Sequence, residues 1–125
     1  MDTMKAVVKK GYGFGEIDLE ERPVPEIDDF DVLIRVKAAG LCGSDVNSYR
    51  GKKTTARPGV ILGHEFAGEI AKVGSRVKRW KIGDRVVSDN TGYVCGVCSN
   101  CAKGEYLLCE HRKGIGSGLD GGFAE

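Results

Sequence analysis

The sequence predicts a mainly β domain, and two observations support this fold class. Glycine accounts for 19 of the 125 residues, about twice its average share, which favours many turns and few long helices. Short β-type runs recur between breaks marked by glycine and proline, and they mix apolar–polar alternation with short apolar stretches. This pattern is typical of strands around a small barrel core.

The expected strands follow one another along the chain. They are Met4–Lys10, Glu16–Arg22, Asp31–Ala39, Glu65–Val73 and Asp84–Ser88, with a further strand start at Gly122–Glu125. We interpret the glycine-rich run Gly11–Gly15 as a hairpin loop, and Pro23 and Pro25 mark another break between strands.

Two segments differ from this pattern. Ser44–Tyr49 predicts a helix of about two turns, which Ser44 or Asp45 can cap directly after a glycine-flanked bend. From Thr91 to Lys113 the hydrophobic periodicity is lost and cysteines take its place. This indicates a lobe that folds around a metal ion instead of an apolar core.

Charge and hydropathy exclude several classes of function. Lysine and arginine number 19 against 18 acidic residues, so the net charge is only +1 and does not favour binding to nucleic acid or anionic lipid. The basic stretch Lys72–Lys81 contains Trp80, but no recognition helix follows it. No run approaches the roughly 18 apolar residues of a membrane span, and the N-terminus has no apolar signal segment. We expect a cytoplasmic protein with neither nucleic acid nor membrane as partner.

Four of the five cysteines form one cluster in the sequence. They follow the pattern Cys95-x2-Cys98-x2-Cys101-x7-Cys109, with spacings too tight for a disulfide framework. Four thiolates are the ligand set of a closed, structural zinc site, and His111 is then a surface residue. An iron–sulfur cluster ranks second, because Glu110 stands where bacterial cluster motifs carry proline. Free structural cysteines are the third alternative.

A second candidate site combines Cys42 with His64 and Glu65. A cysteine, a histidine and a carboxylate are the mixed ligands of a catalytic zinc that keeps one position for water or substrate. Cys42 lies in a glycine-flanked bend, about twenty positions before His64. From spacing alone, a buried cysteine and a hydrogen-bonded core histidine are the commoner explanation, so both interpretations stay open.

Several motifs, taken together and in order, resemble the zinc-dependent medium-chain alcohol dehydrogenases, which include alcohol, polyol and threonine dehydrogenases. They are GLCGSD at Gly40–Asp45, GHEFAG at Gly63–Gly68 with Gly74 and Val77 following, GDRV at Gly83–Val86, the four-cysteine spacing, and GGFAE at Gly121–Glu125. The resemblance covers nearly the whole chain. It implies that residues 1–125 form an incomplete N-terminal domain, a GroES-like partly open β-barrel with short helices and a four-cysteine zinc lobe at about 91–113.

The resemblance also implies roles for individual residues. Cys42 and His64 are expected to bind a catalytic zinc, and Glu65 to coordinate it or hold its water. Asp45 is expected to orient His64, and Ser44 to accept the proton of the alcohol.

The sequence departs from the family pattern in two places. Many relatives carry a histidine at the position of Asn47, where it passes the proton onward, and an asparagine cannot titrate near neutral pH. The chain also stops at Glu125, before the further zinc ligand and the nucleotide-binding domain of relatives. The run Gly116–Gly121 satisfies G-x-G-x-x-G, but it follows the cysteine lobe instead of a strand, so we expect a turn cluster.

These observations predict the N-terminal catalytic domain of a zinc-dependent dehydrogenase that transfers a hydride from a secondary alcohol or polyol to NAD or NADP. We expect the isolated 125 residues to be inactive, because NAD or NADP would bind only with the missing domain. The alternative from another class is a zinc-stabilised β module that mediates protein interaction or self-association as a homo-oligomer. Cofactor binding and a second, exchangeable metal discriminate between the two hypotheses.

Overall fold

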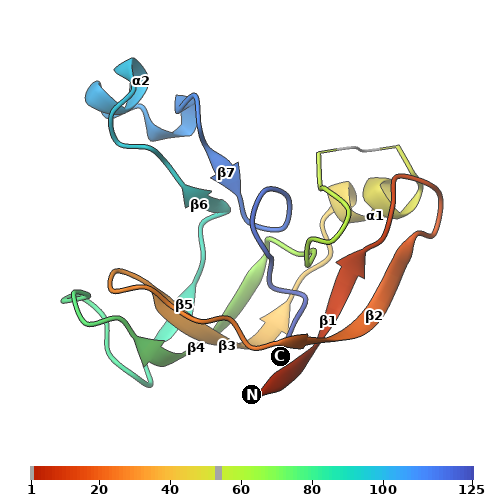
Figure 1. The fold of residues 1–125 in the computed structure, drawn as a ribbon, viewed down its shortest axis with the longest axis horizontal. Helices are drawn as coiled ribbons and strands as arrows, with labels where there is room; N and C mark the ends of the chain where they lie inside the picture. The colour runs from red at the N-terminus through yellow and green to blue at the C-terminus, as the bar shows by residue number, and fades with distance from the viewer. Residues whose placement is uncertain (1, 53–54) are drawn as a thin grey trace.

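A computed structural model of the protein describes residues 2–52 and 55–125 and is mainly β, as predicted (Figure 1). Its strands form three small antiparallel sheets within the described residues. The first sheet pairs β1 (Thr3–Lys9) with β2 (Ile17–Pro23), the second has the order β3 (Val32–Ala39), β4 (Phe66–Val73) and β5 (Arg85–Val87), and the third pairs β6 (Thr91–Tyr93) with β7 (Lys113–Gly114). The first five expected strands are therefore confirmed, with no end shifted by more than one residue.

The helices are short. They are α1 (Gly43–Tyr49), α2 (Ser99–Ala102) and the 3-10 helix η1 (Tyr106–Leu108). The helix expected at Ser44–Tyr49 is confirmed as α1, but its N-cap is Cys42 and not Ser44 or Asp45. Cys42 still has extended backbone angles, whereas the other two residues already lie within the first turn.

One further expectation needs correction. The segment Gly122–Glu125 is not a strand: Ala124 makes a single bridge to Ala6. Its backbone bonds in two directions, because Val7 donates to the Phe123 carbonyl at 2.9 Å and Phe123 donates to Leu62 at 2.9 Å. The cysteine lobe contains β6, α2 and η1 and ends at β7.

The apolar core lies where β1 meets the segment that precedes β4. Its two clusters of buried side chains are Met4, Ala6, Val8 and Ile61, and Ala56, Val60 and Leu62. Main-chain hydrogen bonds join the two segments: Lys9 donates to Val60 at 3.0 Å, and Leu62 donates to Val7 at 3.0 Å. The residues that follow Leu62 are therefore held against β1.

The sheets do not close into a complete barrel. A groove of about 1000 Å³ is lined by β3, by residues 24–27 and by residues 119–122. The cysteine lobe, with its own β6–β7 sheet, extends away from the other two sheets as a separate arm (Figure 1). No helix in the described part of the chain combines the length and the apolar character needed to cross a membrane.

The core assignment predicts different effects for two isoleucines. Ile61 is 2% exposed and Ile82 is 69% exposed. We expect Ile61→Ala to lower the free energy of unfolding by about 2–5 kcal/mol, because it leaves a cavity in the core. The matched control Ile82→Ala should change it by less than about 0.5 kcal/mol. Urea unfolding measures both, and equal losses would contradict the assignment.

Candidate functional site

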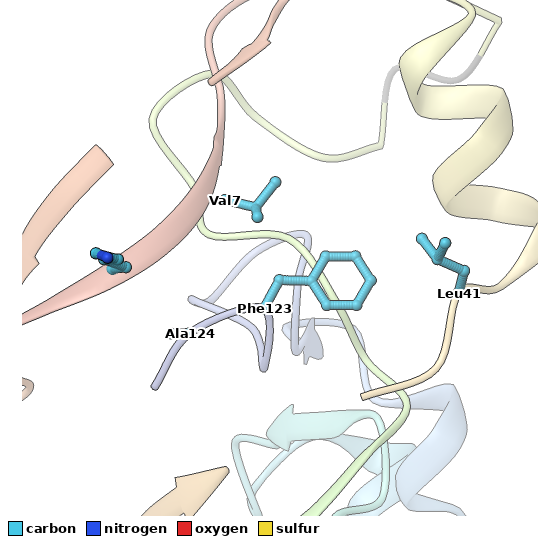
Figure 2. Close-up of a pocket in the computed structure, with 5 residues that line it drawn as sticks. Val7, Leu41, Phe123 and Ala124 are labelled. Carbon is cyan, nitrogen blue, oxygen red and sulfur yellow. The ribbon is translucent and has the colours of Figure 1, made fainter. Parts of the chain in front are cut away.

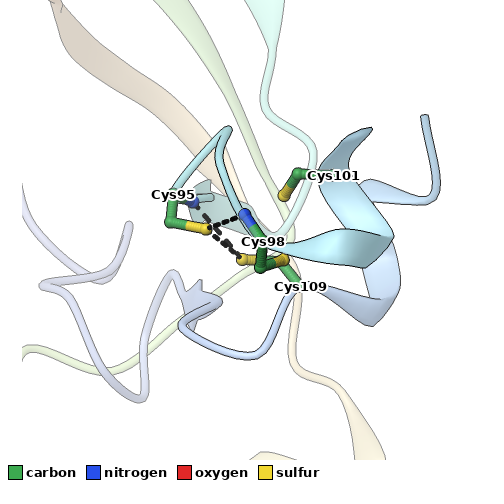
Figure 3. A group of neighbouring side chains, drawn as sticks. All are labelled: Cys95, Cys98, Cys101 and Cys109. Carbon is green, nitrogen blue, oxygen red and sulfur yellow. Dashed lines mark hydrogen bonds between the residues drawn. The ribbon is translucent and has the colours of Figure 1, made fainter. Parts of the chain in front are cut away.

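The four clustered cysteines converge on one point of the lobe (Figure 3). The sulfur atoms of Cys95, Cys98, Cys101 and Cys109 all lie within 4.8 Å of one another, and each cysteine is free of disulfide bonds. The sulfurs of Cys95 and Cys109 are 3.6 Å apart. Four zinc–sulfur bonds of about 2.3 Å in a tetrahedron require sulfur separations of about 3.8 Å. The donor set and its spacing therefore fit a zinc ion.

The short helices α2 and η1 position these sulfurs. Cys98 is the N-cap of α2, Cys101 lies within α2, and Cys109 follows η1 directly. Peptide N–H groups point at the sulfurs: Cys95 donates to Cys109 Sγ at 3.3 Å, and Cys98 donates to Cys95 Sγ at 3.3 Å. His111 is exposed, as predicted, and its backbone N–H donates to Cys109 Sγ at 3.4 Å. These donors stabilise negative charge on the cluster.

The thiols of the cluster differ in acidity. Backbone N–H groups, first of Cys101 and then of Glu110, lower the pKa of Cys98 to about 6. The N–H of Cys95 likewise lowers the pKa of Cys109. Burial raises the pKa of Cys101 to about 12. A divalent cation that replaces the Cys101 proton supplies the positive charge that a thiolate at this buried position needs.

A second centre lies at the start of α1. One ligand atom from each of Cys42, His64 and Glu65 lies within 4.8 Å of the others. Cys42 caps α1, whereas the other two residues directly precede β4. A hydrogen bond of 2.7 Å from the Gly40 amide to the Glu65 carbonyl joins the two segments. The sulfur, nitrogen and oxygen donors fit a zinc with three protein ligands and an open fourth position.

A single carboxylate contacts both halves of this second centre. Asp45 is buried, and its Oδ2 accepts a hydrogen bond of 2.9 Å from the Cys42 amide. Its Oδ1 lies 3.9 Å from His64 Nδ1, which is too long for a hydrogen bond but close enough for electrostatic attraction. Nδ1 therefore faces Asp45, which leaves Nε2 for a metal. The hydroxyl of Ser44 is 3.5 Å from Nε2.

A shallow apolar hollow of about 450 Å³ borders the second centre (Figure 2). Its lining includes Leu41, which directly precedes Cys42, and the ring of Phe123. Gly63 has a φ of 95°, and a Cβ there would lie 2.5 Å from the Phe123 ring. Glycine at this position therefore lets the ring pack beside His64. The hollow contributes no metal ligand.

The remaining candidates supply no ligand to either centre. Asn47 is exposed on α1. Gly116–Gly121 begins as a tight turn, as predicted, in which the Gly116 amide donates to the Leu119 carbonyl at 2.8 Å, and no helix follows it in the described residues. The sequence interpretation assigned no role to Lys9, which is fully buried behind α1. Lys9 ends β1, and it is buried although strand alternation would expose it, because Val8 before it is also buried. Nothing in the sequence indicates that this lysine is buried.

Comparison with known proteins gives relatives that match almost the whole chain. The sorbitol dehydrogenase of Halalkalibacterium halodurans is 48% identical over 122 residues, which are 98% of this chain and 35% of that protein. The D-arabitol-phosphate dehydrogenase of Enterococcus avium is 44% identical with the same coverage. The chain thus spans about a third of the length of these curated relatives.

Solved structures of dehydrogenases also match almost the whole chain. A protein of Sinorhizobium meliloti 1021, described as a zinc-binding dehydrogenase and solved with NADP bound, has a TM-score of 0.89 at 37% identity, over 100% of this chain and 35% of its own. Galactitol-1-phosphate dehydrogenase from Escherichia coli has a TM-score of 0.85 at 38% identity, over 97% of this chain and 34% of its own. The family model of the alcohol dehydrogenase GroES-like domain matches residues 28–125. As the motifs predicted, the chain belongs to the alcohol dehydrogenase GroES-like domain family.

Proposed function

We propose that this chain is the metal-binding N-terminal domain of a zinc-dependent dehydrogenase that oxidises a secondary alcohol or polyol with NAD or NADP. The observation that carries the proposal is the convergence of Cys42, His64 and Glu65 within 4.8 Å. The presence of Ser44 and Asp45 at the same point supports it. Relatives named for sorbitol and D-arabitol phosphate support a polyol as substrate.

Each residue of the second centre has a distinct task. Cys42, His64 and Glu65 would hold the zinc, which when bound supplies Lewis acidity that lowers the pKa of an alcohol. Asp45 holds the Nδ1 side of His64 and fixes the orientation of its ring. Ser44 Oγ, 3.5 Å from Nε2, would accept the proton of the substrate hydroxyl as its own hydroxyl proton passes to solvent water.

The four-cysteine cluster has a structural role in this proposal. Four sulfurs complete a tetrahedron, so no position is left for substrate. Within the lobe only Cys101 and Cys109 are buried apolar side chains. The metal therefore replaces the apolar core that the lobe lacks.

The hydride acceptor is held by residues outside this chain. A solved relative with NADP bound is about three times as long as the chain. In the described residues the G-x-G-x-x-G run forms a turn without a following helix, whereas a dinucleotide pyrophosphate binds at a helix N-terminus after a strand. Self-association as a homo-oligomer stays a prediction.

The structural role predicts which cysteine substitution loosens the lobe. Protein purified without added metal should contain about one tightly bound zinc per chain. We expect Cys101→Ser to remove it and to speed amide exchange in residues 91–113, while β1 and β3 stay protected. The control Cys42→Ser should keep this zinc. Elemental analysis and hydrogen exchange measure both, and loss of protection throughout the chain would contradict a separate lobe.

The second centre predicts a weaker, exchangeable metal. In protein whose four-cysteine site holds zinc, cobalt(II) should bind with about one further equivalent and a sulfur-to-cobalt absorption band. His64→Ala should abolish this binding, because it removes one of only three ligands. His111→Ala is the matched control and should leave it unchanged. A titration in which His64→Ala behaves like the control would exclude the second centre.

The proton role of Ser44 predicts a kinetic effect in a protein that includes the downstream domain. We expect Ser44→Ala to lower kcat by about 10²-fold, the scale of a lost acid–base group, whereas exposed Ser75 provides a control in Ser75→Ala. Stopped-flow measurement of hydride transfer checks this.

For the 125 residues alone, calorimetry should find no saturable binding of NAD or NADP, because we place the residues that bind the cofactor outside this chain. Saturable binding at micromolar concentration would contradict that placement.

A further inference from the structure

Lys9 is the most unusual polar residue of the domain. Its relative exposure is 0%, and its Nζ donates a hydrogen bond of 2.7 Å to Ser48 Oγ. The same Nζ lies 5.5 Å from the centre of the Tyr12 ring. A fully buried lysine is rare unless it is paired, because removing the ammonium group from water is costly. Burial accordingly lowers the pKa of Lys9, while the carboxylate of Glu16 opposes this shift.

The buried polar side chains of the described residues gather at one helix. They are Lys9, Asp45 and Ser48, and the last two lie on α1, three residues apart and therefore on one face. Asp45 contacts the second metal centre from the first turn of α1. Ser48, one turn later, receives the hydrogen bond from Lys9.

The backbone of Lys9 holds the other half of the second centre. Its N–H donates to the Val60 carbonyl at 3.0 Å, and its carbonyl accepts from the Gly59 N–H at 2.7 Å. These bonds fix the segment that leads into His64. Lys9 therefore joins the two parts of the chain that supply the metal ligands, through its main chain on one side and its side chain on the other.

Helix α1 depends on such contacts. It has seven residues, too few for a stable helix without tertiary packing. A hydrogen bond from Gly15 to the Tyr49 carbonyl at 2.8 Å anchors its end, but Ser48 is the side chain that faces β1. Lys9 and Ser48 line neither the apolar hollow nor the large groove.

We propose that Lys9 is a positioning residue, whose hydrogen bond to Ser48 clamps α1 onto β1 and so keeps Cys42, Ser44 and Asp45 aligned with His64. The clamp itself is independent of the proposed function. Its effect on metal binding rests on that function, because it requires the second centre to hold a metal.

The test is a double-mutant cycle with Lys9→Met and Ser48→Ala. Protein with zinc in the four-cysteine site is titrated with cobalt(II), so that only the second centre responds. Each single variant should weaken cobalt binding by about 10-fold, as lost outer contacts of a metal site commonly do. The double variant should be no weaker than either, because one hydrogen bond carries both effects.

Matched variants separate positioning from general destabilisation. Lys10→Met removes the neighbouring, exposed lysine that pairs with Glu20, and it should leave cobalt affinity unchanged. Ser48→Thr keeps the hydroxyl and should restore affinity to near the wild-type value. Additive losses, or an equal loss in Lys10→Met, would overturn the clamp. Ser48→Ala carries the test if Lys9→Met does not fold.

Hydrogen exchange on protein with zinc in the four-cysteine site and no metal in the second centre distinguishes the proposed clamp from the proposed function. In Lys9→Met and Ser48→Ala, the amides of α1 should exchange at least about 10-fold faster than in wild type while those of β4 do not change. If wild type binds no second cobalt but α1 responds in this way, the proposed function fails and the clamp stands. Unchanged exchange in α1 overturns the clamp whatever the metal does.

Discussion

The pairing of β1 with residues 59–62 is the constraint on which the rest of the domain depends. Val8 and Ile61 are almost fully buried and form a bridge at this crossing, so main-chain hydrogen bonds and apolar burial act at the same place. The segment continues through Gly63, whose missing side chain admits Phe123, and then reaches His64. The position of His64 is therefore set by the strongest part of the core, although the residue itself is only half-buried.

The cysteine lobe is stabilised in a different way. Large apolar side chains are present there, but they face solvent: Val97 is 86% exposed and Leu107 is 68% exposed. A lobe with no apolar core has little to offset the conformational entropy that its chain loses on folding. Four sulfurs directed at one point would offset that loss through bonds to a metal, and folding of the lobe and metal binding would then be one equilibrium. The domain thus combines one region held by apolar burial with a lobe in which four converging sulfurs take the place of a core.

The sequence alone predicted those strands and sites that have a hydrophobic period or a recognisable motif. The β1 and β4 runs alternate or concentrate apolar residues, and the Cys95–Cys109 spacing has few interpretations other than a metal site. The strand expected at Gly122–Glu125 failed because its amides divide between two segments: the first two donate to Gly63 and Leu62, and that of Glu125 donates to β1. This division depends on residues distant in the sequence. Elements of two to four residues in the lobe have no period to detect. The cap of α1 was misplaced by two or three residues, since Asp45 lies inside the helix and its side chain accepts a hydrogen bond from the amide of Cys42, the actual N-cap.

The buried charges around α1 agree with the direction of the helix. Asp45 lies in the first turn, where the positive end of the helix dipole favours an anion, and the Lys9 ammonium meets the last turn, where the negative end favours a cation. Both groups are therefore placed where the backbone partly compensates the cost of removing them from water. The carboxylate faces the candidate ligands Cys42 and His64, whereas the ammonium lies at the end of β1. Each turn of this two-turn helix therefore has one buried polar contact, from Asp45 to the Cys42 amide in the first turn and from Ser48 to Lys9 in the second.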